Sequence, residues 1–143
     1  RGLGDVYKRQ TLDNTTYMLY FVITKQKWRQ HMILHNYLSN SGRDLIYEYI
    51  NSLPEAEKID GYTVLQHMEK GEFDKILFKR WEKKVYEVYF QKNNRVFYIT
   101  VDKENIYLLH SCRKQKNKTE KKDANIVRKR AKELGNMLGR KFI

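Results

Sequence analysis

The stretch that decides the fold is residues 79–118, KRWEKKVYEVYFQKNNRVFYITVDKENIYLLHSCRKQKNK. It contains three runs rich in Val, Ile, Tyr and Phe, the residues that pack well on a pleated surface: 85–90, 95–101 and 106–110. The connections are short, because Asn93 and Asn94 tolerate positive φ in a tight turn and residues 102–105 form a polar loop. The pattern predicts a three-stranded antiparallel meander.

Cationic side chains border this meander on both sides. Four precede it and four follow it: Lys79, Arg80, Lys83 and Lys84, then Arg113, Lys114, Lys116 and Lys118. The net charge of +12 resides in residues 79–143, which hold nineteen Lys and Arg against seven Asp and Glu. Such a charge favours a polyanion as partner, since phosphate contacts supply most sequence-independent affinity for nucleic acids. A solvated basic face, or one that binds an acidic protein, is the alternative.

The composition limits the kind of protein. A length of 143 residues suits one domain, and the single cysteine, Cys112, excludes an intramolecular disulfide and a cysteine zinc cage. The four histidines show no metal-ligand spacing, so we expect neither metal nor cofactor. The apolar run at 17–23 is far shorter than the roughly 20 residues of a membrane helix. We therefore expect a cytoplasmic protein without a membrane partner.

The rest of the chain predicts the layers around the meander. Residues 32–38 alternate as a strand does, and 44–53 and 55–70 read as two helices joined at Pro54 and ended by Gly71. Thr119 is placed to cap a last helix, whose apolar stripe is Ala124, Val127, Ala131, Leu134 and Leu138. We predict an α+β domain over 32–143, in which an antiparallel sheet of about four strands carries an N-terminal helix hairpin and a C-terminal helix. Residues 1–31 are expected to be an extension outside it.

Several short motifs carry a family resemblance. NSLP at 51–54, YEV at 86–88, RVFY at 95–98 and LLH at 108–110 before a Lys-rich run occur in an order that resembles the RelE/HigB-like toxins of bacterial type II toxin–antitoxin systems. The resemblance implies a small toxin that enters the ribosomal A site and cuts mRNA without a metal. It also implies neutralisation by a cognate antitoxin, which we expect to be of the helix-turn-helix type.

The chain departs from the family pattern at two places. Tyr89 stands where such toxins usually carry an Arg, and residues 112–115 replace an aromatic followed by paired Lys. Relatives that poison DNA gyrase share the scaffold, so a ParE-like toxin stays an alternative. A module that only binds RNA or an antitoxin is the third.

Metal-free RNA cleavage requires three tasks at the scissile phosphate. A group must take the 2′-OH proton, another must stabilise the phosphorane, and another must protonate the 5′ oxygen. Guanidinium groups are bidentate phosphate donors, which suits Arg95 and Arg113 as charge stabilisers. His110 is a candidate acid or base, and Lys114 and Lys116 are alternatives because crowded cations lower a lysine's pKa.

Other residues are expected to hold the RNA. Lys79, Arg80, Lys83, Lys84 and Lys118 suit backbone contacts, and Tyr89 suits stacking on a base. Each assignment has a structural alternative. His110 can be a packed core residue, and Arg95 can pair with Glu87 on the neighbouring strand. Cys112 has no His/Asn constellation around it in the sequence, so we expect it to be a small hydrophobe.

Overall fold

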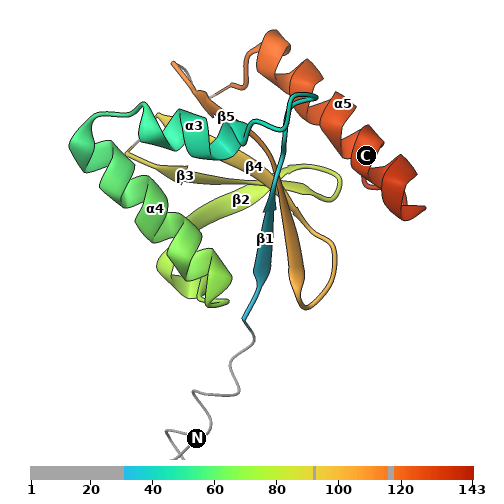
Figure 1. Cartoon of the computed structure of the whole chain (residues 1–143), viewed down its shortest axis with the longest axis horizontal. Coiled ribbons are helices and arrows are strands. Elements are labelled where there is room, and N and C mark those ends of the chain that lie inside the picture. Colours follow the sequence, from blue (N-terminus) through green and yellow to red (C-terminus); the bar gives the residue numbers. More distant parts are fainter. Residues whose placement is uncertain (1–30, 92, 116–117) are drawn as a thin grey trace, which may run out of the picture. The chain divides into compact units, whose positions relative to one another are not determined.

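The computed structural model describes residues 31–143, except 92, 116 and 117 (Figure 1). The expected extension at 1–31 therefore lies, apart from His31, outside the described residues. The elements in chain order are β1 (Ile33–Asn36), α3 (Leu45–Asn51), α4 (Glu55–Glu69), a 3-10 turn (Phe73–Lys75), β2 (Leu77–Glu82), β3 (Val85–Phe90), β4 (Asn94–Thr100), β5 (Asn105–Arg113) and α5 (Lys121–Leu138).

The sheet has five strands in the order β1-β5-β4-β3-β2. Strands β2 to β5 pair antiparallel, whereas β1 pairs with β5 in parallel. The prediction of an α+β fold holds, but that of about four antiparallel strands is wrong on two counts. Strand β2 was missed because Lys79 and Arg80 made the stretch read as a basic loop, although edge strands tolerate such charges. The parallel pairing of β1 was not predicted.

The meander agrees with the prediction except at its joints. Strand β3 has the expected bounds, β4 is shifted one residue earlier, and β5 begins one residue earlier and continues three residues further, to Arg113. In the β3–β4 turn the positive φ falls on Gln91 (47°), while Asn94 is already the first residue of β4. The β4–β5 loop is closed by the Asp102 carboxylate, which accepts the backbone N–H groups of Glu104 and Asn105 at 2.8 and 2.9 Å.

Helices α3 and α4 cover one face of the sheet, which we call the helix-pair face. The Asp44 carboxylate caps α3 by accepting the Tyr47 N–H at 2.8 Å. The core beneath the pair combines apolar residues of both helices with those of the strands, namely Ile46, Ile50, Leu53, Met68, Val88, Phe90, Val96, Tyr98, Ile106 and Leu108. Gly61 permits the close approach, because a Cβ there would lie 3.0 Å from side-chain atoms of Ile50 and Phe90.

Helix α5 packs on the opposite face, which we call the α5 face; in Figure 1 it lies apart from α3 and α4. The predicted stripe is confirmed, since Ala124, Val127, Ala131 and Leu134 are buried. The strands contribute Val85, Phe97, Ile99 and Leu109 to this second core. The cap residue is Glu120 rather than the predicted Thr119, and the helix ends at Gly139 with φ of 68°.

None of the helices in residues 31–143, as far as these are described, is long and apolar enough to cross a membrane.

Candidate functional site

The strand register sorts the predicted site residues onto the two faces. Directly opposed residues of neighbouring strands point to the same side of a sheet. The α5 face contains a row of opposed residues, and contacts among them show that they share it. These residues are Lys79 opposite Glu87, Tyr89 opposite Arg95, and Phe97 opposite both Glu87 and His110. Four predicted residues, Lys79, Tyr89, Arg95 and His110, thus share one face.

A buried carboxylate organises the middle of this face. Glu87 is 1% exposed, and its Oε1 accepts a hydrogen bond from Lys114 Nζ at 2.8 Å. Arg95 Nε lies 3.2 Å from the same oxygen. Because an unpaired buried charge is costly, these contacts explain why Arg95 and Lys114 are themselves only 9% and 4% exposed. The alternative that Arg95 pairs with Glu87 is confirmed, and Lys114 joins the pair.

Tyr89 lies beside this cluster, between two cations. The Arg95 guanidinium carbon is 4.9 Å from the centroid of its ring, and Lys79 Nζ is 5.9 Å from it. Tyr89 is half-buried and Lys79 is exposed. An aromatic ring held among cations at a reachable surface is the arrangement on which an unstacked base can lie.

His110 makes two contacts with α5. Its Nε2 is 2.8 Å from Asp123 Oδ1, and its Nδ1 is 3.4 Å from Arg130 Nη1. Burial lowers the pKa of His110 from its ordinary value, and the nearby Arg130 and Lys122 lower it further, against the raising effect of Asp123. A neutral ring donates from Nε2 to Asp123 and presents an unprotonated Nδ1 to the guanidinium.

His110, Cys112 and Asp123 together have the atoms to ligate a metal, and these atoms lie within 4.8 Å of one another. The surroundings fit a metal poorly. Arg130 faces the nitrogen that a zinc-bound histidine uses to donate a hydrogen bond, and burial raises the pKa of the Cys112 thiol to about 12. The hydrogen-bonded His110–Asp123 pair beside an apolar thiol explains the trio better. Cys112 is 7% exposed, which agrees with the expectation that it is a small hydrophobe.

Arg113 lies on the helix-pair face, away from Arg95 and Lys114. Its Nη2 donates to Glu57 Oε1 of α4 at 2.7 Å, and Asn94 Nδ2 donates to the same oxygen at 2.8 Å. These hydrogen bonds, that from Asn94 first, hold the pKa of Glu57 below its usual value. The next residue, Lys114, instead contacts Glu87 on the α5 face, so Arg113 and Lys114 do not share one site. The structure does not bring Arg113 together with Arg95 and His110.

The basic residues before the meander do not form one cluster either. Arg80 is opposed to Tyr86, on the face opposite that of Lys79. Lys83 and Lys84 form the β2–β3 turn, where Lys83 has φ of 54° and the Lys84 N–H donates to Phe142 O at 3.3 Å. Lys116 lies outside the described residues.

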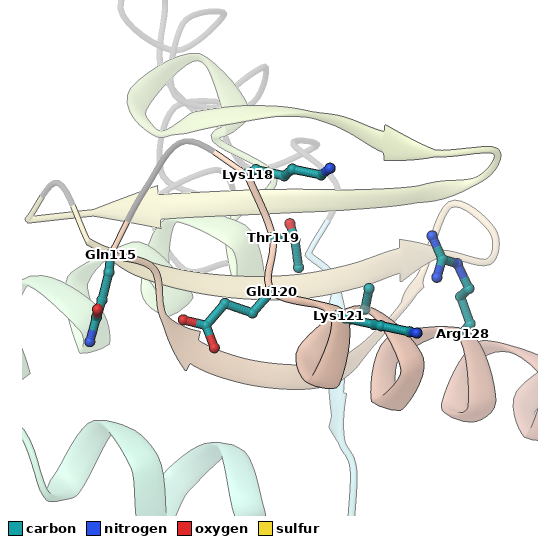
Figure 2. A pocket seen from close by; sticks show the side chains of 7 residues that line it. Gln115, Lys118, Thr119, Glu120, Lys121 and Arg128 are labelled. Carbon is teal, nitrogen blue, oxygen red and sulfur yellow. The ribbon is translucent and has the colours of Figure 1, made fainter.

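The exposed Lys118 lines a hollow of about 640 Å³ where the segment after β5 enters α5 (Figure 2). The other lining residues are Gln115, Thr119, Glu120, Lys121, Ala124 and Arg128. Sequence reasoning missed Lys121 and Arg128. Their spacing of seven, two helical turns, was the available signal that both lie on one side of α5.

Comparison with known proteins identifies the family of the chain. The profile described as phage-derived protein Gp49-like (DUF891) matches residues 48–132, from α3 into α5. No curated protein matches the chain. Because the matched span is more than half of the 143 residues, the chain belongs to the Gp49-like family, a RelE/HigB-type toxin family of toxin–antitoxin systems.

Proposed function

We propose that this chain is the toxin of a type II toxin–antitoxin pair and that it cleaves mRNA on the ribosome without a metal. The observation that carries the proposal is the position of Tyr89, with Arg95 at 4.9 Å and Lys79 at 5.9 Å from its ring. Single-stranded RNA of any sequence can stack a base on an aromatic ring and place its phosphates against cationic side chains. Family membership supports a toxin, and this surface supports RNA as its ligand.

Arg95 and Lys114 are the proposed stabilisers of the phosphorane. Glu87 Oε1 contacts both side chains, so their positions are set before substrate arrives. Two cations around one carboxylate keep a net positive charge, and a preorganised charge stabilises a transition state without reorganisation at the moment of reaction. Tyr89 would hold a base next to them.

His110 is the proposed acid or base. Its ring stacks against Phe97 with centroids 6.4 Å apart, and Lys114 Nζ lies 5.9 Å from the Phe97 centroid, so His110 and Lys114 flank one aromatic ring. Asp123 fixes its tautomer. Arg113, on the opposite face, is proposed to contact RNA backbone outside the reaction centre, together with Arg80, Lys83 and Lys84. Lys116 stays an alternative to His110 as acid or base.

The partners follow from the proposed reaction. A ribosome-dependent nuclease acts in the cytoplasm on mRNA, and a cell that carries it needs an antitoxin, which we propose to be of the helix-turn-helix type. The antitoxin would be encoded beside this chain.

Expression of the toxin in a bacterial host, followed by primer extension on transcripts, tests the proposal. We expect growth arrest with new 5′ ends inside translated transcripts, and no new ends when the start codon of the same transcript is removed. Arg95→Lys and Tyr89→Leu should each reduce cleavage about 10-fold or more, as expected for loss of a preorganised contact. Intact transcripts with altered supercoiling would support a gyrase poison instead, and absence of arrest would support a module that only binds.

A further inference from the structure

We propose that the hollow at the start of α5 is a phosphate subsite, in which Lys118, Lys121 and Arg128 bind the RNA backbone outside the cleaved linkage. The proposal rests on the proposed function for the identity of the RNA. It adds a binding site and two residues, Lys121 and Arg128, that neither the sequence patterns nor the family assigned.

The charges of the hollow are directed to one side. In Figure 2 the side chains of Lys118, Lys121 and Arg128 extend to the same side of the segment that leads into α5. The carboxylate of Glu120, the acidic residue among those that line the hollow, turns to the other side. A phosphate that enters from the cationic side therefore meets three positive groups without facing that carboxylate.

Arg128 is held in position for such a contact. Its guanidinium carbon lies 5.3 Å from the centroid of the Trp81 ring, and its Nε donates to Glu82 Oε2 at 2.9 Å. The interaction with Glu82 uses Nε, so the two terminal nitrogens keep their donors for a phosphate oxygen. Glu82 offsets part of the charge of Arg128, and the two lysines supply the larger share.

The size and the backbone of the hollow fit the same ligand. A volume of about 640 Å³ accommodates a phosphate with its ribose, and the residues that line it belong to the loop before α5 and to α5 itself. The first turn of the 18-residue α5 lines the hollow, so the positive end of its dipole adds to the attraction. The subsite would continue the RNA path on the α5 face, since Trp81 packs edge-on against Phe97 of that face at 5.2 Å.

Salt-dependent binding of a fluorescent single-stranded RNA oligonucleotide tests the subsite. The test variant is Lys118→Gln/Lys121→Gln/Arg128→Gln, and the matched control is Lys70→Gln/Lys75→Gln/Lys103→Gln, which removes the same charge at exposed positions outside α5. Each lost contact to a single strand lowers the slope of log K against log salt by about 0.7, so the test variant should lose about 2. The control should retain the wild-type slope, and thermal unfolding of all three proteins should show that they fold.

Equal slopes in the two variants would overturn the subsite. A second result would also overturn the RNA subsite. The wild type would bind inorganic phosphate and the test variant would not, while both show the same salt dependence of RNA binding; the hollow would then be a site for free phosphate. Transcript cleavage is assayed in parallel, because it reports on the proposed function alone. If the wild type cleaves transcripts but the test variant keeps the wild-type slope of log K against log salt, the subsite is rejected. If the test variant shows the lower slope but the wild type cleaves no transcript, the nuclease function is rejected.

Discussion

The two faces of the sheet are built by different physical means. The helix-pair face is closed by apolar side chains of α3 and α4. Beside them a polar network joins Tyr49, Asn94, Glu57 and Arg113, in which Asn94 is fully buried but uncharged. The α5 face has its own apolar core, but next to it Glu87, Arg95 and Lys114 are buried as charges. Apolar burial stabilises about 25 cal/mol per Å², whereas a buried ion pair seldom stabilises more than the apolar residues that could replace it. The difference agrees with the proposal that the α5 face, and not the helix-pair face, carries charges for RNA.

Replacement of Glu87 by Gln tests this difference most severely. Glu87→Gln keeps the shape but leaves two buried cations without a counter-charge, which should lower the free energy of unfolding by about 3–5 kcal/mol. Urea unfolding measures the loss. Glu48→Gln breaks an exposed ion pair with Arg43 and serves as control, with little change expected.

The simultaneous change Glu87→Leu/Arg95→Met/Lys114→Met sharpens the same point. Stability should return to near the wild-type value or above it, since apolar residues of similar volume replace a buried ionic cluster without loss. Affinity for RNA should fall. Recovery of stability together with wild-type RNA affinity would show that the charges serve neither purpose.

A change on the helix-pair face should affect stability alone. In Gly61→Ala the new methyl group would meet Ile50 and Phe90 at 3.0 Å, and such overpacking costs about 1–3 kcal/mol. RNA affinity of the folded fraction should not change. A loss of affinity at a temperature where the variant is fully folded would remove the functional distinction between the faces.

Near pH 6.5, above the range in which carboxylates titrate, the pH dependence of stability should trace to His110 on the α5 face. Burial lowers the pKa of His110 in the folded chain below its ordinary value of 6.5, so the unfolded chain binds more protons between these two values. The free energy of unfolding should therefore fall as pH drops through 6.5. Chemical unfolding at a series of pH values should show a shallower fall in His110→Gln, whose amide can still donate to Asp123, while the exposed His31→Gln keeps the wild-type slope.

Arg113→Gln should have the smallest effect. Its side chain is 42% exposed and its partner Glu57 also accepts from Asn94, so the urea midpoint should hardly move. Cleavage should stay within a few-fold of wild type. A loss as large as that of Arg95→Lys would place Arg113 in the reaction centre despite its position on the other face.

Periodicity predicted most of the fold, because local patterns report local structure. The strands 85–90 and 95–101, the helix pair and the stripe of α5 required only alternation or a repeat of three and four residues. Strand β2 was missed because its sequence, LFKRWE, is exposed at most positions and shows no core-facing alternation. The parallel neighbour of β1 depends on residues far away in the chain, which no local pattern encodes.

The candidate site was predictable in residue types but not in partners. Arginine, lysine and an aromatic residue near a strand end indicated RNA, and Arg95 with Glu87 was foreseen from cross-strand pairing. Two further contacts were not foreseen, that of Lys114 with Glu87 and that of Asp123 on α5 with His110. Both depend on the packing of α5 and of the end of β5 against the sheet, which no local pattern encodes. The separation of Arg113 from Lys114 could have been foreseen from alternation, had β5 been expected to continue to Arg113.

The parallel pairing of Ile33 with Asn105 also has a consequence for synthesis. On the ribosome β1 is made well before β5, and antiparallel neighbours close at once whereas this pair must wait for the intervening chain. The β1–β5 ladder can therefore form only when the last strand of the meander is made, and it joins the first strand of the described domain to the last strand in the chain. A nascent toxin cut short before β5 would carry no such ladder, so an unfinished chain cannot acquire the finished surface.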